Sequence, residues 1–390
     1  MSKHLLQRFI SPEFLSRISP MLLRKLLSPY RDFFRKHRVD IDAEPLSTKN
    51  LATTLFVQCL SIPEPLLESL TVIESLCTDR LIDRILTFAG EHGIAHEGGR
   101  KNAADIAVQM WLFDRDLVEQ VLGKDLLRAG KTLYFYRSSQ TPPPVEFNDA
   151  TIRCMEEDYN QWLMENGRGR TGRLFVYNDQ SIVTILARHG EPFRRLPIIR
   201  DGESSVTVLQ PEAYDQLIFD PQTGELGVKA RTEKIRQGHL QWLSRHLLAQ
   251  GDRFCKYDRF MLDNLIHPYV VPVGCADILG IDQVHLDRIE VAIPTGQLRP
   301  VRIALDCDEL PYHYGQFLQD IPDDAEVHRV KFKIRLMGDR YLRRLVISSP
   351  NRIEFGTGLG IEEVHQWLIR RHLQQPTDRE KRHEQVLACV

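Results

Sequence analysis

Apolar residues in the first 130 positions recur mostly at spacings of three and four, the period of amphipathic helices. Three Ser-Pro pairs begin at Ser11, Ser19 and Ser28, and an apolar stretch follows each. Serine is a favoured N-cap and proline is favoured at the first helical position, so each pair predicts the start of a short helix. The N-terminal region is therefore expected to be a helical domain.

A β-favouring run at 132–136 (TLYFY) follows, and three consecutive prolines occupy 142–144. A triple proline fits neither the interior of a helix nor a central strand. This segment therefore predicts a domain boundary, with the helical domain extending over 1–138.

The period of the pattern changes from position 147 onward. Residues 150–164 predict one helix, and short β-rich runs follow until a second helix at 231–249. After a loop-rich connection, another set of β-rich runs precedes a helix at 361–375. Because strands follow strands and helices stand only at the ends, the pattern predicts an α+β fold with antiparallel sheets.

Two tripeptides, Gln241-Trp242-Leu243 and Gln366-Trp367-Leu368, lie in matching surroundings, QWLSRHLLAQ and QWLIRRHLQQ. Two apolar runs joined by a turn precede each copy. The repetition predicts two related antiparallel-sheet units, 147–255 and 283–375, each closed by a helix that its tryptophan anchors to the sheet. A charged tail is expected at 376–390.

Composition narrows the class of protein. The chain is 42% hydrophobic and 27% charged, with a formal charge of −2, so its overall charge does not demand a nucleic-acid partner. Seven cysteines without a CxxC pair argue against a disulfide framework and a cysteine-based zinc site. No apolar run is long enough for a membrane span, and the N-terminus does not resemble a signal peptide. A cytoplasmic protein without membrane contact is expected.

Arg188-His189-Gly190-Glu191 follows a predicted strand and resembles the Arg-His-Gly motif of the histidine phosphatase family. That resemblance implies His189 as the phosphorylated nucleophile and Arg188 as a phosphate ligand. The likeness covers four residues and then runs into another predicted strand, where the family has a loop and a helix. A charged turn between two strands is the alternative interpretation.

Cationic side chains in two segments are candidate nucleic-acid contacts: Arg168, Arg170, Arg173, Arg329, Lys331, Lys333 and Arg335. The first three belong to a Gly/Arg loop whose amides and guanidinium groups suit phosphate, although Gly167 also fits a helix C-cap. The other four alternate with apolar residues along a predicted strand, so they share one face. That face either lies along phosphates or is the solvated side of a half-buried sheet.

Other catalytic and metal patterns are weak. His92 and His96 have a metal-like spacing, but neighbouring glycines would break the helix that must aim them. Asp220, Glu225 and Lys229 come nearest to a nuclease pattern, yet the Glu-to-Lys spacing is too long. The chain has no P-loop and no dinucleotide fingerprint, so neither a metal nor another cofactor is expected.

Four stretches distributed over nearly the full length carry a further resemblance: FLSRISPMLLRKLL, ENGRGRTGRLFVY with LARHGEPFRR, PEAYDQLIFDPQTGELGVKARTEKIRQ, and LRRLVISSPNRIEF. In their order and spacing the chain resembles a family of uncharacterised bacterial proteins often found in mobile elements and defence-type gene neighbourhoods. The resemblance implies a component of a multi-gene system and carries over no catalytic residue. It also indicates that the likeness of RHGEPF to the phosphatase motif is coincidental.

The sequence thus predicts a non-enzymatic adaptor or sensor subunit that contacts nucleic acid or a partner protein through basic surfaces. A phosphate-ester hydrolase that uses His189 and Arg188 is the first alternative. A structural scaffold that binds only protein is the second. The sequence leaves the oligomeric state open.

Overall fold

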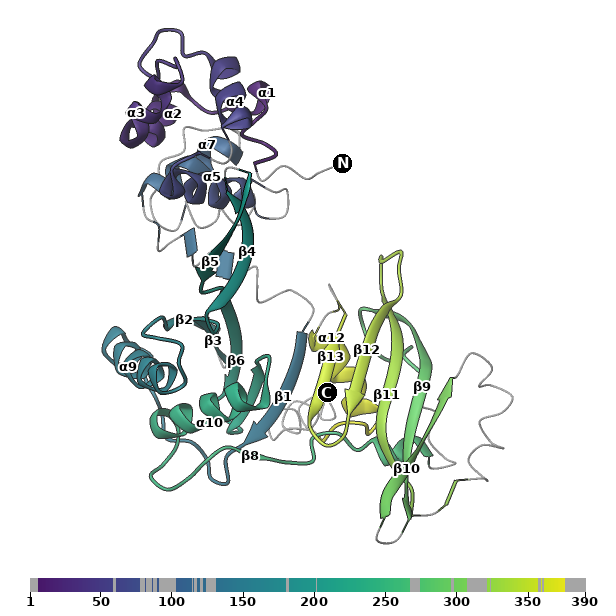
Figure 1. The fold of residues 1–390 in the computed structure, drawn as a ribbon. Helices are drawn as coiled ribbons and strands as arrows, with labels where there is room; N and C mark the ends of the chain where they lie inside the picture. Colours follow the sequence, from purple (N-terminus) through teal and green to yellow (C-terminus); the bar gives the residue numbers. More distant parts are fainter. Residues whose placement is uncertain are drawn as a thin grey trace. The chain divides into compact units, whose positions relative to one another are not determined.

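The protein is described from a computed structural model, and its described residues are 6–58, 61–77, 81, 86, 90, 103–113, 115, 118–119, 122–123, 131–179, 182–200, 202–266, 274–295, 298–306, 321–322, 324–356, 359 and 361–375. Two compact units make up the chain, Met1–Leu126 and Leu127–Val390 (Figure 1). The predicted tail at 376–390 and the histidines His92 and His96 lie outside the described residues.

The first unit is helical, as its apolar period predicts. Its described helices are α1 (Pro12–Leu15), α2 (Pro20–Leu27), the 3-10 turn η1 (Ser28–Tyr30), α3 (Arg31–Lys36), α4 (Thr48–Val57), α5 (Glu64–Leu76) and α7 (Ala103–Phe113). Two of the three Ser-Pro predictions are confirmed, because the hydroxyl groups of Ser11 and Ser19 accept the amides of Phe14 and Leu22 at the starts of α1 and α2. Ser28 differs, since it opens the 3-10 turn that leads into α3.

The second unit is built on one antiparallel sheet. Its strands are β1 (Lys131–Arg137), β2 (Arg173–Asp179), β3 (Ile182–Gly190), β6 (Glu212–Asp220), β7 (Glu225–Lys229), β8 (Cys255–Lys256), β9 (Ile281–Thr295), β10 (Leu298–Asp306), β11 (Glu326–Leu336), β12 (Arg343–Ser348) and β13 (Arg352–Phe355). They lie in the order β10-β9-β11-β12-β13-β1-β7-β6-β3-β2, and β8 pairs with β1 off this path (Figure 1). The protein therefore has mixed α and β structure with antiparallel strands, as predicted.

Strand β1 lies at the centre of this sheet. Its residues 131–134 pair with β13 and its residues 134–137 pair with β7, so it joins two groups of strands that follow it in the sequence. The predicted boundary at 138 assigned this run to the helical domain, whereas the structure joins it to the second unit. The prolines at 142–144 follow the end of the strand and do not interrupt it.

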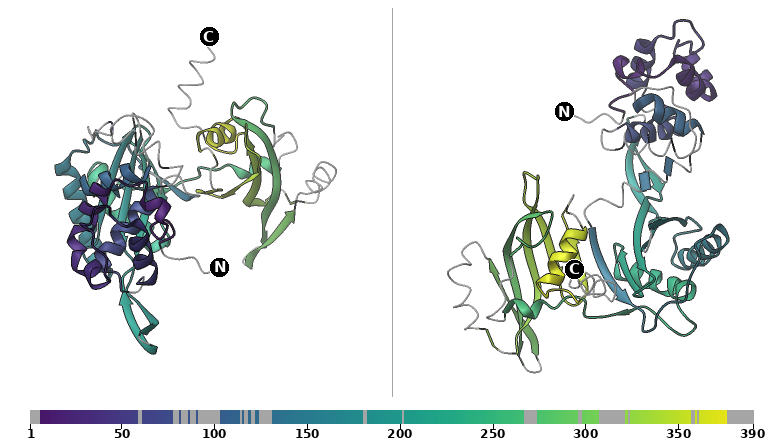
Figure 2. Two further views of the ribbon diagram at one scale, coloured as in Figure 1. Left: turned by 90° about the horizontal axis from the view of Figure 1, so that it is seen from above. Right: turned by 180° about the vertical axis from the view of Figure 1, so that it is seen from behind.

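The two faces of β1 pack into different hydrophobic cores. Leu133 and Phe135 belong to a core with helix α12 (Ile361–Arg370) and the 3-10 turn η2 (Leu262–Ile266). Tyr136 belongs to a second core with helices α9 (Asp149–Glu165) and α10 (Glu233–Leu247), and Tyr134 packs against that core. Because neighbouring strand residues point to opposite faces, α9 and α10 lie on one face of the sheet and α12 on the other (Figure 2).

The predicted anchoring role of the two tryptophans is confirmed. Trp242 on α10 is 1% exposed and Trp367 on α12 is fully buried, and each helix follows a hairpin, β6–β7 or β12–β13. The Trp367 ring meets Phe332 edge to face at 5.0 Å between centroids. Another tryptophan, Trp162 on α9, lies so close to α10 that a side chain at Gly238 would overlap its ring.

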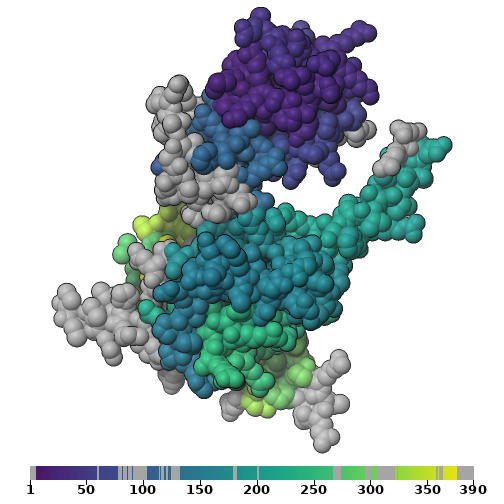
Figure 3. Space-filling view, turned by 90° about the vertical axis from the view of Figure 1, so that its left-hand side faces the viewer, coloured from purple at the N-terminus to yellow at the C-terminus, as the bar shows by residue number. Residues whose placement is uncertain are grey.

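Strands β4 (Arg194–Arg200) and β5 (Glu203–Leu209) form a separate two-stranded ribbon. The ribbon stands out from the second unit in the space-filling view (Figure 3). Elsewhere, no helix among the described residues combines the length and the apolar character that a bilayer crossing requires.

Replacement of Trp367 by alanine should destabilise the second unit by about 3–5 kcal/mol, because it leaves a large cavity under α12 and removes the indole N–H bond to Gly274 O. The free energy of unfolding, taken from urea denaturation followed by far-ultraviolet circular dichroism, measures the effect. Tyr341→Ala, at a turn position that is 69% exposed, is the control and should change it by less than about 0.5 kcal/mol. Equal losses in the two variants would contradict the anchoring role.

Candidate nucleic-acid interface

The predicted alternation of β11 is confirmed and places its cations on one side of the sheet. Val330, Phe332 and Ile334 are fully buried in the core under α12. The intervening side chains therefore point to the opposite face: Arg329, Lys331, Lys333 and Arg335.

Neighbouring strands add further charges to the same face. Leu345 and Ile347 of β12, and Ile353 and Phe355 of β13, face the α12 core, so their alternate residues share the face with the β11 cations. We call this surface the open face, and its charged members on β11, β12 and β13 are Arg329, Lys331, Lys333, Arg335, Arg344, Arg352 and Glu354. No helix in the described part of the chain packs on it over these strands, because the helices on this side, α9 and α10, belong to the core over β2, β3, β6 and β7.

The cations of the open face divide into two groups by their partners. Lys333 is paired with Asp287 and Arg335 with Asp282, whereas Arg344 and Arg352 approach Glu354. Arg329 and Lys331 differ from them. Both are half-buried, and neither forms a hydrogen bond or an ion pair with a described residue.

The Gly/Arg loop does not gather its three arginines around one point. Gly167 has φ +69°, and the amides of Gly167 and Arg168 return to the carbonyl groups of Met164 and Leu163. These two bonds form the Schellman motif that ends α9, which is the alternative that Gly167 left open. The guanidinium of Arg168 points inward to His189 and Gly190 O.

The other two arginines of the loop have their own contacts. Arg170 pairs with Glu157 at 2.5 Å, and Arg173 lies over the ring of Phe175 at 5.2 Å. The loop therefore offers less free positive charge than its sequence predicts.

A chain of buried polar groups runs beneath α10. Asp215 on β6 accepts hydrogen bonds from His189 Nε2 at 3.0 Å and His239 Nε2 at 2.8 Å. The indole N–H of Trp242 donates to His239 Nδ1, and Arg168 Nη1 lies 3.1 Å from His189 Nδ1. Since the indole N–H can only donate, His239 accepts at Nδ1 and donates from Nε2 to the carboxylate, whereas His189 Nδ1 lies 3.1 Å from both Arg168 Nη1 and Gly190 O.

This arrangement keeps Asp215 ionised. Burial raises the pKa of the carboxyl, but the hydrogen bonds and the attraction of the two histidines outweigh it and lower the pKa to about 2. Asp215 and His239 were not predicted as functional residues. The sequence signal that could have identified Asp215 is a charged residue at an inward-facing position of a strand, on the same face as Leu217 and Phe219.

The geometry does not supply the phosphatase site that the Arg-His-Gly motif suggested. Arg188 and His189 are consecutive in β3 and point to opposite faces, so they do not converge on one phosphate. His189 is 2% exposed, and both of its ring nitrogens are engaged. Arg188 lies 3.7 Å from Glu212. The short motif is thus part of a buried structural network.

The weaker catalytic and metal patterns are likewise not assembled. Glu225 is held by Tyr257 and Arg259, and the Asp220 carboxylate caps the turn that joins β6 to β7. Lys229 lies at the far end of β7 from Glu225. Among the described residues, no group of three or more His, Cys, Asp or Glu side chains is placed to hold a metal ion.

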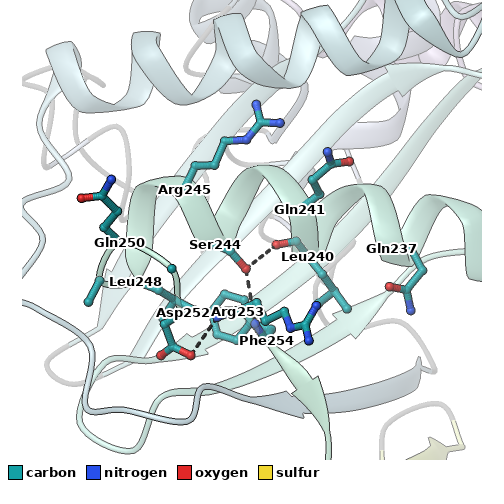
Figure 4. Close-up of a pocket in the computed structure, with 12 residues that line it drawn as sticks. Gln237, Leu240, Gln241, Ser244, Arg245, Leu248, Gln250, Asp252, Arg253 and Phe254 are labelled. Carbon is teal, nitrogen blue, oxygen red and sulfur yellow. Dashed lines mark hydrogen bonds between the residues drawn. The ribbon is translucent and has the colours of Figure 1, made fainter.

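Two hollows lie in the second unit. A groove of about 590 Å³ follows α10 and the loop after it, where Ser244 Oγ bonds Leu240 O and the amide of Phe254 (Figure 4). A second hollow of about 470 Å³ lies where β3, β6 and β7 meet the start of α10, and His189, Asp215 and Lys229 are among its lining residues. The groove holds mainly amides and already bonded groups, whereas the second hollow gathers titratable side chains.

Comparison of the sequence with protein-family models and with curated proteins yields no match. The candidate interface is therefore supported by the geometry of the structure alone.

Asp215→Asn should lower the free energy of unfolding at pH 7 by about 1–3 kcal/mol, because both histidine N–H groups donate to Oδ2 and the substitution replaces two charge-assisted hydrogen bonds by weaker neutral ones. The free energy of unfolding of wild-type protein should also fall by about 2 kcal/mol as the pH falls from about 4 to 2. The ionised Asp215 carboxylate stabilises the fold, and this contribution is lost as the carboxylate is protonated. Urea denaturation across this pH range measures both effects. In Asp215→Asn this acid-dependent part should be absent.

The matched control is Glu212→Gln, an exposed carboxylate on the same strand. It should leave the pH profile unchanged. An identical acid profile for wild-type protein and Asp215→Asn would contradict the assigned network.

Proposed function

We propose that the protein binds nucleic acid along the open face and acts without catalysis, as an adaptor or sensor subunit. The observation that carries the proposal is the pair Arg329 and Lys331, half-buried cations that form no hydrogen bond or ion pair with a described residue. The Nε atom of Arg329 is buried and has no hydrogen-bond partner among the described residues, so it loses hydration that no described group replaces. A bound phosphate would supply the missing partner.

The arrangement of the cations supports an extended ligand. Side chains two apart on a strand are separated by about 6.8 Å, so Arg329 and Lys331 can contact different anionic groups. Arg344 and Arg352 extend the positive surface across β12 and β13. Such a surface favours a polyanion over a single small anion.

The wider setting that we propose comes from the sequence. The resemblance to mobile-element and defence-associated bacterial proteins favours a cytoplasmic component of a multi-gene system. We also propose that β6–β7–α10 and β12–β13–α12 are related units. The matching Gln-Trp-Leu segments support this, as does the pairing of β7 and β13 with opposite ends of β1.

The double variant Arg329→Ala with Lys331→Ala should weaken binding of a labelled single-stranded oligonucleotide. Log affinity falls as log salt rises, and because two phosphate contacts are lost, this negative slope should become less steep by about 1.4. Fluorescence anisotropy over a series of salt concentrations measures both quantities.

Lys333→Ala with Arg335→Ala is the matched control on the same strand. These cations are already paired with Asp287 and Asp282, so their loss should have a smaller effect. Absence of binding by wild-type protein at low salt, or equal effects of the two double variants, would reject the proposal.

A protein partner is the second candidate, and the β4–β5 ribbon favours it. One face of the ribbon carries Pro197, Ile199, Val206 and Val208, and Ile199 and Val208 are 80% and 63% exposed. An isolated two-stranded ribbon is marginally stable in water, and an exposed apolar surface of this kind marks an interaction site.

Ile199→Lys with Val208→Lys should abolish co-purification of a partner protein from the native host, because charge on this apolar face opposes its burial. Ser204→Lys, on the same face of the ribbon, is the polar control and should retain more of the partner. Affinity purification followed by mass spectrometry measures recovery. Equal recovery with all variants would exclude the ribbon as the contact.

A further inference from the structure

The hollow of about 470 Å³ lies in the second unit, at the ends of several strands and the start of α10. Its side chains come from β1, β3, β6, β7, β13, α10 and the segments that border these elements. Four of them are cationic: Lys229, Arg231, Arg236 and Arg352. A hollow of this size is in the range that holds a small ligand.

The two carboxylates of the hollow are both held by hydrogen bonds or ion pairs from groups of the protein itself. Asp215 accepts the two histidine bonds described above. Glu191 is bound by Arg231 at 2.8 Å and by Arg194, which lies outside the hollow. Glu191 is thus paired with arginines, whereas Asp215 keeps its charge and attracts Lys229 without forming an ion pair with it.

Lys229 is the cation of the hollow that forms no ion pair with a described residue. Its ammonium forms no hydrogen bond or ion pair with a described residue. Burial lowers the pKa of this group, with partial compensation by the charge of Asp215. A lysine in this state gains from an anion that reaches it.

The other walls are held in place before a ligand arrives. Arg236 donates to Ala230 O and to Glu233, and its guanidinium lies 3.7 Å from the centroid of the Tyr134 ring. Such fixed side chains reduce the ordering cost of binding. The hollow is thus a preformed site.

Arg352 connects the hollow to the open face. It lines the hollow and also belongs to β13, in register with Tyr134 of β1. Its Nε atom is buried and has no hydrogen-bond partner among the described residues, although its Nη2 lies 3.4 Å from Glu354. A ligand on the open face and a group in the hollow can therefore share this arginine.

We propose that this hollow binds a phosphate monoester group, with Lys229 as its principal charge contact and Arg352 as its guanidinium contact. An ammonium with three donors and a guanidinium fork both match the oxygens of a phosphate. The group could be carried by a free mononucleotide or by the end of a strand on the open face. The second source rests on the proposed function.

Isothermal titration with inorganic phosphate, a nucleoside 5′-monophosphate and the unphosphorylated nucleoside tests the pocket. Wild-type protein should bind the two phosphate-bearing ligands and not the nucleoside. Lys229→Met should weaken the binding of both about tenfold or more, because a charge-assisted contact is lost. Lys229→Arg should restore part of the affinity.

Lys234→Met is the matched control, since this lysine lies in the first turn of α10, is exposed and does not line the hollow. It should leave the affinity for the monophosphate unchanged. Circular dichroism establishes that each variant is folded. Equal weakening by Lys229→Met and Lys234→Met, or no binding of either phosphate-bearing ligand, would overturn the proposal.

A 5′-phosphorylated oligonucleotide and its 5′-hydroxyl counterpart separate the two sources. A preference for the phosphorylated strand that disappears in Lys229→Met supports the strand end. Equal binding of the two strands, together with nucleotide binding that depends on Lys229, assigns the hollow to the free nucleotide. Oligonucleotide binding that depends on Arg329 and Lys331, without any ligand that depends on Lys229, overturns this inference and leaves the proposed function intact.

Discussion

The position of β1 is the constraint on which the second unit depends. Phe135 and Asn351 fix its register, because the amide of Phe135 donates to Asn351 O and Asn351 Nδ2 donates to Phe135 O. Arg259 lies over the Phe135 ring at 3.9 Å and is paired with Glu225 of β7, and its amide donates to Pro350 O in the turn before β13. A slip of one residue would exchange the side chains that enter the two cores.

This constraint also explains where the open face and the hollow lie. Because β1 presents alternate residues to two cores, α9 and α10 cover one face of the sheet and α12 the other. The face that α10 covers on one side of β1 continues without a described helix over β11, β12 and β13. The hollow lies beside that transition, where Tyr134 and Arg352 meet residues at the start of α10.

The sequence predicts local structure well and distant pairing poorly, for physical reasons. The alternation in β11 follows from burial of Val330, Phe332 and Ile334, and it is visible within ten residues. The central role of β1 is not, because its partner β13 lies more than two hundred residues away. For the same reason, the contact of His189 with Asp215 cannot be derived from the local RHGE motif, whose likeness to a catalytic sequence was misleading.

The arrangement of unpaired cations argues that the surface is more than a solvated sheet. Most charged side chains of the open face are paired at short range, as Lys333 and Arg335 are. Arg329, Lys331 and Lys229 are half-buried and form no such pair with a described residue, and the buried Nε atom of Arg329 has no hydrogen-bond partner there either. The half-buried cations on the open face and in the hollow beside it are the observations on which we base the proposed anionic ligand.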